Sequence, residues 1–259
     1  MVIGGGVAGL CAAFVAKERG HVVTLYEAGE KLGGNMRLVA YPPGKGDITN
    51  MIRSYIHRCQ KDGVKIVMNC EVTPELIKEE KPDSVIIATG SKTLILPIEG
   101  IDNPAIIHGS DLLDGKRPAG KKVLVVGGGM VGCETAAFLG EQEHDVTVIE
   151  FRDTVGADVI HEHRVYLMKD FEDYGIKEIT GAKVCKFYED GVEYETADGV
   201  RHESRGYDSV ILSMGFRNYN PLEEKIKELV PETHVIGDAI RARRALDATK
   251  EAYEVASRL

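Results

Sequence analysis

Short apolar runs alternate with longer amphipathic segments along most of this chain. Residues 21–26 and 84–88 are apolar and rich in β-branched side chains, which is typical of buried parallel strands. Apolar positions at helical spacing over 10–19 and 48–62 predict helices, and a glycine that commonly ends a helix follows each of them. The first third of the chain therefore predicts strands that alternate with helices, which is the pattern of an α/β protein.

The same alternation returns after residues 97–120, which are rich in proline and glycine and which we interpret as a connection between domains. Residues 131–143 predict a helix, residues 145–149 a strand and residues 161–174 a further helix. Short strands are expected at 178–179, 183–188 and 191–196. The second half of the chain thus begins again with an α/β pattern.

Two stretches of the sequence repeat one another without a gap. Residues 4–27 read GGGVAGLCAAFVAKERGHVVTLYE and residues 127–150 read GGGMVGCETAAFLGEQEHDVTVIE. In the first stretch, Gly4 permits a tight turn, Gly6 lets a pyrophosphate approach the backbone, and Gly9 lets the helix pack against the strand. The helix N-terminus then offers free N–H groups and a partial positive charge to phosphates. The matching glycines of the second stretch are Gly127, Gly129 and Gly132.

An acidic residue ends the second strand of each repeat. Glu27 and Glu150 follow the last glycine at close to the distance of about 20 residues at which an acid binds ribose hydroxyls. An acid at this place repels a ribose 2′-phosphate, so Glu150 favours NADH over NADPH, although the nearby Arg152 could accommodate that phosphate. Each repeat therefore contains the strand, glycine turn, helix, strand and acid of a dinucleotide site.

Two dinucleotide sites in one chain indicate that two dinucleotides are brought together, which suggests electron transfer between them. Two other interpretations stay open. One is an ancestral duplication in which one site has since been lost, and the other is a pair of glycine turns that bind nothing.

A further carboxylate stands in the tail of the chain. Asp238 follows a strand predicted at 233–236 and precedes a helix predicted at 244–259. It therefore lies at the carboxyl end of a strand, where open α/β sheets bind ligands. A helix N-cap is the alternative role for this residue. The tail is too small to form a domain and is expected to pack on the first one.

These features predict the fold class α/β, with two Rossmann-like dinucleotide-binding domains, one inserted into the other. The strand at 207–213 runs into Met214-Gly215 as the strand at 84–88 runs into Thr89-Gly90, which marks the return of the chain to the first domain. The first domain is predicted to comprise 1–106 and 214–259, and the inserted domain 107–213.

The composition narrows the choice of partners. With 43% hydrophobic and 28% charged residues, the 259-residue chain is typical of a globular protein, and its net charge of −9 argues against a nucleic acid or an anionic membrane as partner. No apolar run is long enough to cross a bilayer. The five cysteines form no CxxC or other short-spaced pair, so no metal site is expected, and unpaired thiols fit a cytoplasmic location.

The motifs together resemble the two-dinucleotide-binding-domain flavoproteins. They occur in the order of that family: Gly4-x-Gly6-x-x-Gly9 with Glu27, Gly33-Gly34, Thr89-Gly90, the inner glycine motif with Glu150, and Gly237-Asp238. The resemblance implies FAD in the first site and NAD(P)H in the inserted domain. It also implies that Asp238 contacts the ribityl chain of the flavin, and that backbone amides near Ala245 approach the isoalloxazine.

Longer stretches narrow this resemblance. GGN…YPPGKGDI, GGGMVGCETAAFL and GDAIRARRALDATKEAYE are similar to the C-terminal half of the Old Yellow Enzyme fusion flavoproteins, which include 2-enoate reductase, 2,4-dienoyl-CoA reductase and trimethylamine dehydrogenase. In the full proteins, a TIM barrel with FMN and an iron–sulfur cluster precedes this half. Because the chain opens within its first motif, we expect a fragment that lacks this barrel. Without a cysteine pair, reduction of thioredoxin or lipoamide is not expected.

The resemblance implies that NADH passes hydride to FAD, and that electrons then reach FMN on the barrel through the iron–sulfur cluster. The cofactors supply this chemistry, so no catalytic side chain is assigned, and His161 and His163 are interpreted as solvated. NADH and the barrel are the expected partners, and a homo-oligomer is left open. One rival function is a stand-alone NADH-dependent flavin reductase or diaphorase. Another is a structural or regulatory module that holds ADP without hydride transfer.

Overall fold

The computed structural model describes all residues, 1–259, and divides into two compact units. The first unit comprises residues 1–40, 46–92 and 216–259, and the second comprises 41–45 and 93–215. The chain leaves the first unit and later returns to it, as an inserted domain requires. The predicted α/β fold class with one domain inserted into another is therefore confirmed, while the predicted domain boundaries at 106/107 and 213/214 stay predictions.

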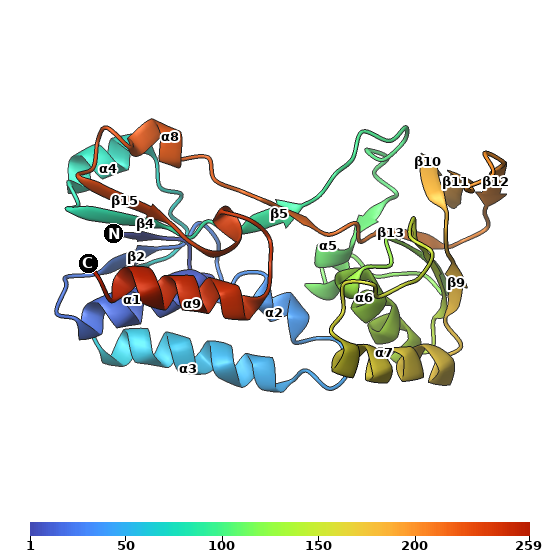
Figure 1. Cartoon of the computed structure of the whole chain (residues 1–259), viewed down its shortest axis with the longest axis horizontal. Coiled ribbons are helices and arrows are strands. Elements are labelled where there is room, and N and C mark those ends of the chain that lie inside the picture. Colours follow the sequence, from blue (N-terminus) through green and yellow to red (C-terminus); the bar gives the residue numbers. More distant parts are fainter. The chain divides into compact units, whose positions relative to one another are not determined.

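The first unit is built on a five-stranded sheet in which all pairings are parallel, in the order β15–β4–β1–β2–β3 (Figure 1). Its strands are β1 (Val2–Ile3), β2 (Thr24–Tyr26), β3 (Lys65–Val67), β4 (Ser84–Ile87) and β15 (Glu232–Val235). Helices α1 (Val7–Glu18), α3 (Asp47–Lys61) and α9 (Ala245–Ala256) cover one face, and α4 (Pro74–Glu80) and α8 (Glu223–Ile226) the other. The tail thus contributes both an edge strand and a covering helix to the first unit.

The second unit contains a parallel sheet of the same design, in the order β6–β13–β7–β8–β9. Its strands are β6 (Ile107–His108), β7 (Lys122–Val126), β8 (Asp145–Ile149), β9 (Lys177–Ile179) and β13 (Ser209–Leu212). Helices α5 (Gly109–Leu113), α6 (Met130–Glu141) and α7 (His161–Asp173) pack on one face. An antiparallel sheet of β10 (Lys183–Tyr188), β11 (Gly191–Glu195) and β12 (Arg201–Ser204) packs on the other.

Several elements differ from the sequence-based expectation. The segment 97–120 is more than a connection, because it contains β6 and α5 and belongs to the second unit. The remaining short elements are α2 (Met36–Val39) and the two paired strands β5 (Ser91–Thr93) and β14 (Phe216–Asn218). Both helices that follow glycine turns, α1 and α6, begin within the glycine motif itself, earlier than the apolar spacing predicts.

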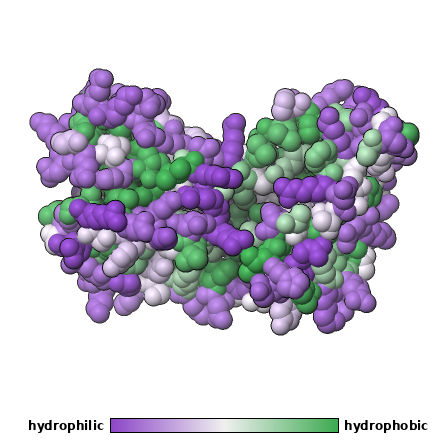
Figure 2. Space-filling model, viewed as in Figure 1, coloured by the Kyte–Doolittle hydropathy of each residue, from purple (hydrophilic) through white to green (hydrophobic).

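Each unit has its core between the sheet and its covering layers. Apolar side chains such as Leu25 and Ile87 in the first sheet, and Val125 and Ile211 in the second, are fully buried. The surface seen in Figure 2 is mainly hydrophilic, with smaller hydrophobic areas among the polar residues. None of the helices combines the length and apolar character needed to span a membrane.

Candidate dinucleotide sites

The three glycines of the first turn are needed for different reasons, two of them for the fold and one for the open space beside it. Gly4 has a φ of +106°, and a Cβ on it would lie 2.3 Å from the carbonyl oxygen of Ala88. A Cβ on Gly9 would lie 1.9 Å from the carbonyl oxygen of Gly4. Gly6, in contrast, has an extended backbone, with no atom within 4 Å of a Cβ. The fold therefore requires glycine at positions 4 and 9, whereas at position 6 it leaves open the space that a pyrophosphate needs.

The acid of the first repeat is fixed by backbone amides. The two carboxylate oxygens of Glu27 accept hydrogen bonds from Gly5 N and Gly29 N, both at 2.7 Å. An ionised carboxylate has about four acceptor sites, so each oxygen can accept one further bond from a hydroxyl. Glu27 is thus held at the end of β2 in an orientation suited to the two hydroxyls of a ribose.

The predicted glycine loop lies against this turn. Gly33 N donates to the carbonyl oxygen of Gly5 at 2.8 Å, and a Cβ on Gly34 would lie 3.1 Å from the Cα of Gly6. A side chain on Gly34 would therefore press against the backbone of Gly6, beside the open space that a pyrophosphate would occupy.

Residues predicted from the ends of two other strands lie at the same edge of the first sheet. The hydroxyl of Thr89 donates to the carbonyl of Tyr219, whose N–H donates to Gly90 O at 2.9 Å. A Cβ on Gly237 would lie 3.1 Å from the Cβ of Ala8 in the first turn of α1. The structure thus brings Thr89, Gly90 and Gly237 together with the first glycine turn, at the carboxyl ends of the strands.

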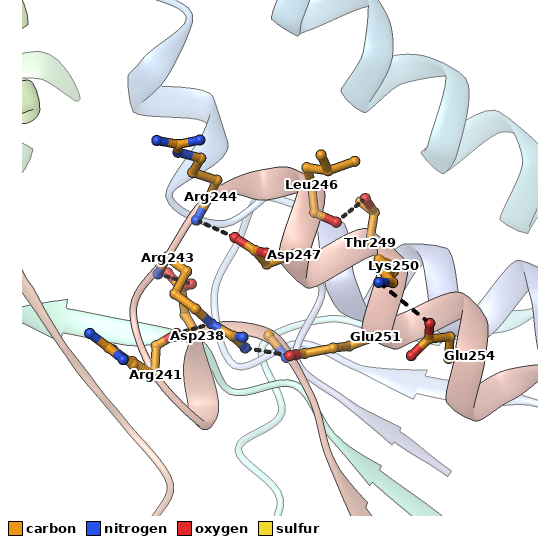
Figure 3. A network of polar contacts seen from close by, with 11 residues as sticks. Asp238, Arg241, Arg243, Arg244, Leu246, Asp247, Thr249, Lys250, Glu251 and Glu254 are labelled. Carbon is orange, nitrogen blue, oxygen red and sulfur yellow. Dashed lines mark hydrogen bonds and ion pairs between the residues drawn. The ribbon is translucent and has the colours of Figure 1, made fainter. Parts of the chain in front are cut away.

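Asp238 is held by two hydrogen bonds and does not cap the following helix. Its Oδ2 accepts from Ser91 Oγ at 3.0 Å. Its Oδ1 accepts from Arg243 N at 3.1 Å (Figure 3). Helix α9 begins at Ala245, after Arg244, whose N–H donates to the Asp247 carboxylate at 3.3 Å. The N-cap alternative for Asp238 is therefore wrong, and Ala245 lies in the first turn of a helix packed on α1.

Sequence reasoning missed the partner of the Gly237 turn. Glu251 of α9 accepts a hydrogen bond from Gly237 N at 2.8 Å and forms an ion pair with the guanidinium of Arg243 (Figure 3). These contacts tie the turn that carries Asp238 to the middle of α9. A glutamate within an amphipathic helix is common, and no local pattern distinguishes this one.

The second glycine turn reproduces the first. Gly127 has a φ of +107°, and a Cβ on Gly132 would lie 1.8 Å from the carbonyl oxygen of Gly127. The Glu150 oxygens accept from Gly128 N at 2.6 Å and from Arg152 N at 2.9 Å. The two repeats thus fold into the same arrangement of turn and acid, down to the individual hydrogen bonds.

A cavity of about 510 Å³ opens at this second turn. Its lining includes three of the predicted residues, namely Gly127, Gly129 and Glu150. It also includes the exposed Phe151 and Arg152 and the residues at the end of β13. Gly132 is buried beneath the turn, where it allows α6 to approach β7. The predicted residues of the second repeat therefore border or support a single cavity.

One buried acid in the second unit was not predicted. Glu134 in α6 is only 5% exposed, and it forms an ion pair with Lys45 and lies 3.2 Å from Nε2 of His163. The interpretation of His163 as simply solvated is therefore wrong. Glu134 occupies the position of Cys11 in the first repeat. A carboxylate on an otherwise apolar helix was the sequence signal that could have revealed this cluster.

The structural repeat extends beyond the two acids. At the same sequence offset, Gly156 N donates to Gly128 O at 2.7 Å, as Gly33 N donates to Gly5 O. The repeat reaches Asn35 in the first unit and Asp158 in the second. Nδ2 of Asn35 donates to Ser91 O at 3.3 Å.

Asp158 has a different partner from that of Asn35. Its Oδ1 accepts from Met130 N, the first amide of α6, at 2.9 Å. Its Oδ2 lies 3.3 Å from the position of a Cβ on Gly129. We call each glycine turn, together with the acid beside it, a cradle. The second cradle therefore contains the Asp158 carboxylate at the place where, in the first cradle, no atom lies within 4 Å of a Cβ on Gly6.

The buried thiols near the turns are unreactive. Burial raises the pKa of Cys11 and of Cys59 to about 11 and that of Cys133 to about 12. Because the thiolate is the reactive form, none of these three residues is suited to disulfide exchange at neutral pH.

The chain matches a family of known proteins over most of its length. Residues 1–236 match the family described as pyridine nucleotide-disulphide oxidoreductase. The chain is 33% identical over 262 residues to the cinnamate reductase of Clostridium sporogenes, and 33% identical over 262 residues to the NADH oxidase of Thermoanaerobacter brockii. These alignments cover 100% and 99% of this chain, but only 39% and 40% of the relatives.

A solved structure gives the same result. A 2-naphthoyl-CoA reductase complex superimposes with a TM-score of 0.94 at 31% identity, covering 100% of this chain and 39% of that protein. These matches confirm the expected likeness to the FAD/NAD(P)-binding part of the Old Yellow Enzyme fusion flavoproteins. The chain spans about two-fifths of the length of the curated relatives it matches.

Proposed function

We propose that this chain is a module in which NADH reduces a bound flavin. The chain belongs to the pyridine nucleotide-disulphide oxidoreductase family, and the proposal starts from that membership. Family membership implies FAD and NAD(H) as the cofactors, in agreement with the sequence-based prediction. The observation that carries the proposal is the duplicated cradle, in which Glu27 and Glu150 are held by equivalent amide bonds beside equivalent glycine turns.

We assign the two cofactors to the two units. FAD would be held in the first unit by Gly4, Gly6, Gly9, Glu27, Gly33, Gly34, Thr89, Gly90, Gly237, Asp238 and Ala245. NADH would be held in the second by Gly127, Gly129, Gly132 and Glu150. The open space at Gly6 and the cavity at Gly129 support this assignment. NADH is the preferred donor in this proposal, since the fixed carboxylate of Glu150 opposes a 2′-phosphate.

The side chains and amides of this chain would bind and orient the cofactors. When bound, NADH supplies a hydride and FAD accepts it, so the chemistry belongs to the cofactors. The amides at the starts of α1 and α6 would bind pyrophosphates, and the two acids would bind ribose hydroxyls. Asp238, fixed by Ser91 Oγ and Arg243 N, would offer its remaining acceptor sites to hydroxyls of the flavin chain.

The whole parent protein would carry the electrons further. The relatives are longer than this chain, and the names of two of them, cinnamate reductase and 2-naphthoyl-CoA reductase, denote reduction of a conjugated or aromatic acid derivative. We therefore propose that this module feeds an iron–sulfur and FMN barrel of an enoate- or dienoyl-CoA-reductase-like parent. The five cysteines of this chain are free thiols, which favours a location in a reducing cytoplasm.

An absorbance titration tests the proposal. The purified chain is supplied with FAD, freed of excess flavin, and titrated with NADH under anaerobic conditions. We expect a protein-bound flavin band that bleaches on addition of about one equivalent of NADH. If the chain binds ADP but not FAD, it is an ADP-holding module and the hydride-transfer proposal is wrong.

A second candidate, a stand-alone NADH-dependent flavin reductase, is favoured by the likeness to an NADH oxidase. Turnover of NADH with oxygen or free flavin, measured with the parent protein and with this chain, separates the two functions. Equal turnover by both would favour the stand-alone enzyme. Much faster turnover with the parent and its acid substrate would favour the module.

A further inference from the structure

We propose that Asp158 weakens the binding of the NADH pyrophosphate and so keeps the second site exchangeable, whereas the first site, with Asn35 at the equivalent position, retains its dinucleotide. This inference rests on the proposed function, because it assumes that NADH binds at the second glycine turn. It assigns to one side chain a difference in affinity between two glycine turns whose acids make equivalent backbone hydrogen bonds.

The Asp158 carboxylate lies at the start of α6, beside the second glycine turn. Its Oδ1 accepts the hydrogen bond of Met130 N at 2.9 Å, and this amide opens α6. Its Oδ2 lies 3.3 Å from the place of a Cβ on Gly129, the glycine beside which a pyrophosphate approaches the backbone. Asp158 thus presents negative charge to the helix N-terminus that would otherwise attract a phosphate.

Asp158 is part of a fixed segment. Gly156 N is bonded to Gly128 O at 2.7 Å, and Val155 and Val159 are buried. The guanidinium of Arg164 donates to Val155 O at 3.1 Å. The carboxylate can rotate about its own side-chain bonds, but its backbone remains beside the turn. An incoming pyrophosphate must therefore displace the hydrogen bond between Met130 N and Asp158, or bind next to the Asp158 carboxylate.

The first repeat supplies the comparison. Asn35 stands at the matching position, carries no charge and donates its side-chain amide to Ser91. The first cradle therefore offers its phosphate-binding amides without a competing charge. A resident cofactor needs slow dissociation, whereas a substrate that must leave after each turnover needs weaker binding, and the Asn/Asp difference acts in this direction.

Binding measurements on the FAD-loaded chain test the inference. The variant Asp158→Asn removes the negative charge and gives position 158 the same side chain as Asn35, its equivalent in the first repeat. We expect NADH and ADP to bind at least about tenfold more tightly to this variant at low ionic strength, because like charges within a few ångströms repel one another. The gain should shrink in high salt, which screens the repulsion. Adenosine, which has no phosphate, should bind equally to both proteins.

Two further variants complete the design. Asp153→Asn removes the same charge from the same segment, away from the cavity lining, and should leave the affinity for ADP unchanged. The reciprocal Asn35→Asp should lower the FAD content after gel filtration. A gain for ADP that is matched by adenosine would show a structural effect and overturn the inference.

The outcomes also separate this inference from the proposed function. Equal or weaker ADP and NADH binding to Asp158→Asn overturns the inference alone. If NADH and ADP bind to neither protein while FAD is retained, the proposed function is wrong and the inference is wrong with it.

Discussion

The two glycine turns of this chain form the same cradle in different surroundings. In both, a glutamate at the end of a strand accepts two backbone hydrogen bonds beside a turn that requires glycine. The neighbours differ, since the first turn has Asn35 and Cys11 where the second has Asp158 and Glu134. The comparison shows that one backbone arrangement occurs twice with different side chains around it, and we propose that these side chains set which dinucleotide binds and how long it stays bound.

The largest expected effect separates the role of glycine in binding from its role in folding. We predict that Gly6→Val abolishes FAD binding, weakening it at least about 100-fold, while the chain stays folded. The reason is that a Cβ at this position meets no protein atom and the backbone is extended, so the added side chain only fills the space for the pyrophosphate. FAD content after gel filtration and the circular dichroism spectrum measure the two properties.

Gly9→Val is the matched control for this prediction. Its Cβ would lie 1.9 Å from Gly4 O, so it should disrupt the packing of α1 on β1 and lower thermal stability strongly. A Gly6→Val protein with full FAD content would contradict the assignment of FAD to this turn.

The next effect concerns the buried acid that only the second repeat has. We predict that Lys45→Met lowers the free energy of unfolding by about 1–3 kcal/mol, because Glu134 then loses its lysine partner at a site that is 5% exposed and keeps only the contact with His163. Urea unfolding measures the change. Lys61→Met, at the exposed end of α3, serves as control, and an equal effect of the two substitutions would show that the Lys45 contact adds nothing.

A smaller effect tests how the second acid selects its cofactor. We predict that Glu150→Ala narrows the preference for NADH over NADPH by about tenfold, because the repulsion of a 2′-phosphate is lost while Arg152 remains. Affinities for both nucleotides, measured by fluorescence titration, give the ratio. Glu178→Ala removes an exposed carboxylate from the neighbouring strand β9 and should leave the ratio unchanged. An unchanged ratio in Glu150→Ala would mean that another group makes the choice.

The sequence predicted those parts of the structure that depend on local pattern. The strand 145–149 has the predicted bounds, and the glycine turns stand beside the predicted acids. Both follow from β-branched runs and from backbone conformations that only glycine adopts. The tail was expected to pack on the first unit because it is too small to form a domain, and β15 indeed pairs with β4.

The missed features depend on contacts between distant residues. Glu134 and Lys45 are 89 residues apart, and Glu251 and Gly237 are 14 residues apart with a turn and a helix start between them, so no periodicity links the members of either pair. Asp158 could not be predicted for another reason, because it lies beyond Glu150, in a segment where the two repeats share few residues. In this segment, loop residues are chosen by their hydrogen bonds to the turn, so the likeness there is weak in sequence and clear only in the structure.

The smallest effect at neutral pH concerns the thiols beside the two turns. Cys11 in α1 and Cys133 in α6 are both buried, whereas Cys70 and Cys185 are partly exposed. We predict that a thiol reagent at pH 7 labels Cys70 and Cys185 in the folded chain and the buried thiols only after unfolding. Mass spectrometry of the labelled peptides measures this. Rapid labelling of Cys133 in the folded protein would contradict its burial.

The buried thiol of Cys133 leads us to predict a loss of folding stability at high pH. Burial raises the pKa of Cys133 to about 12 in the folded chain, while an unfolded thiol has a pKa of about 8.5. The folded state therefore holds this proton more tightly, so its contribution is full below about pH 8.5 and is lost as the pH rises toward 12. The loss is at most about 1.4 kcal/mol per pH unit for one thiol. Urea unfolding from pH 8 to about 10.5 should show a shallower decline for Cys133→Ala than for the unmodified chain, since tyrosines and lysines titrate equally in both. Parallel declines would mean that ionisation of Cys133 does not oppose folding, and that the cysteine beside the second turn is only a small apolar side chain.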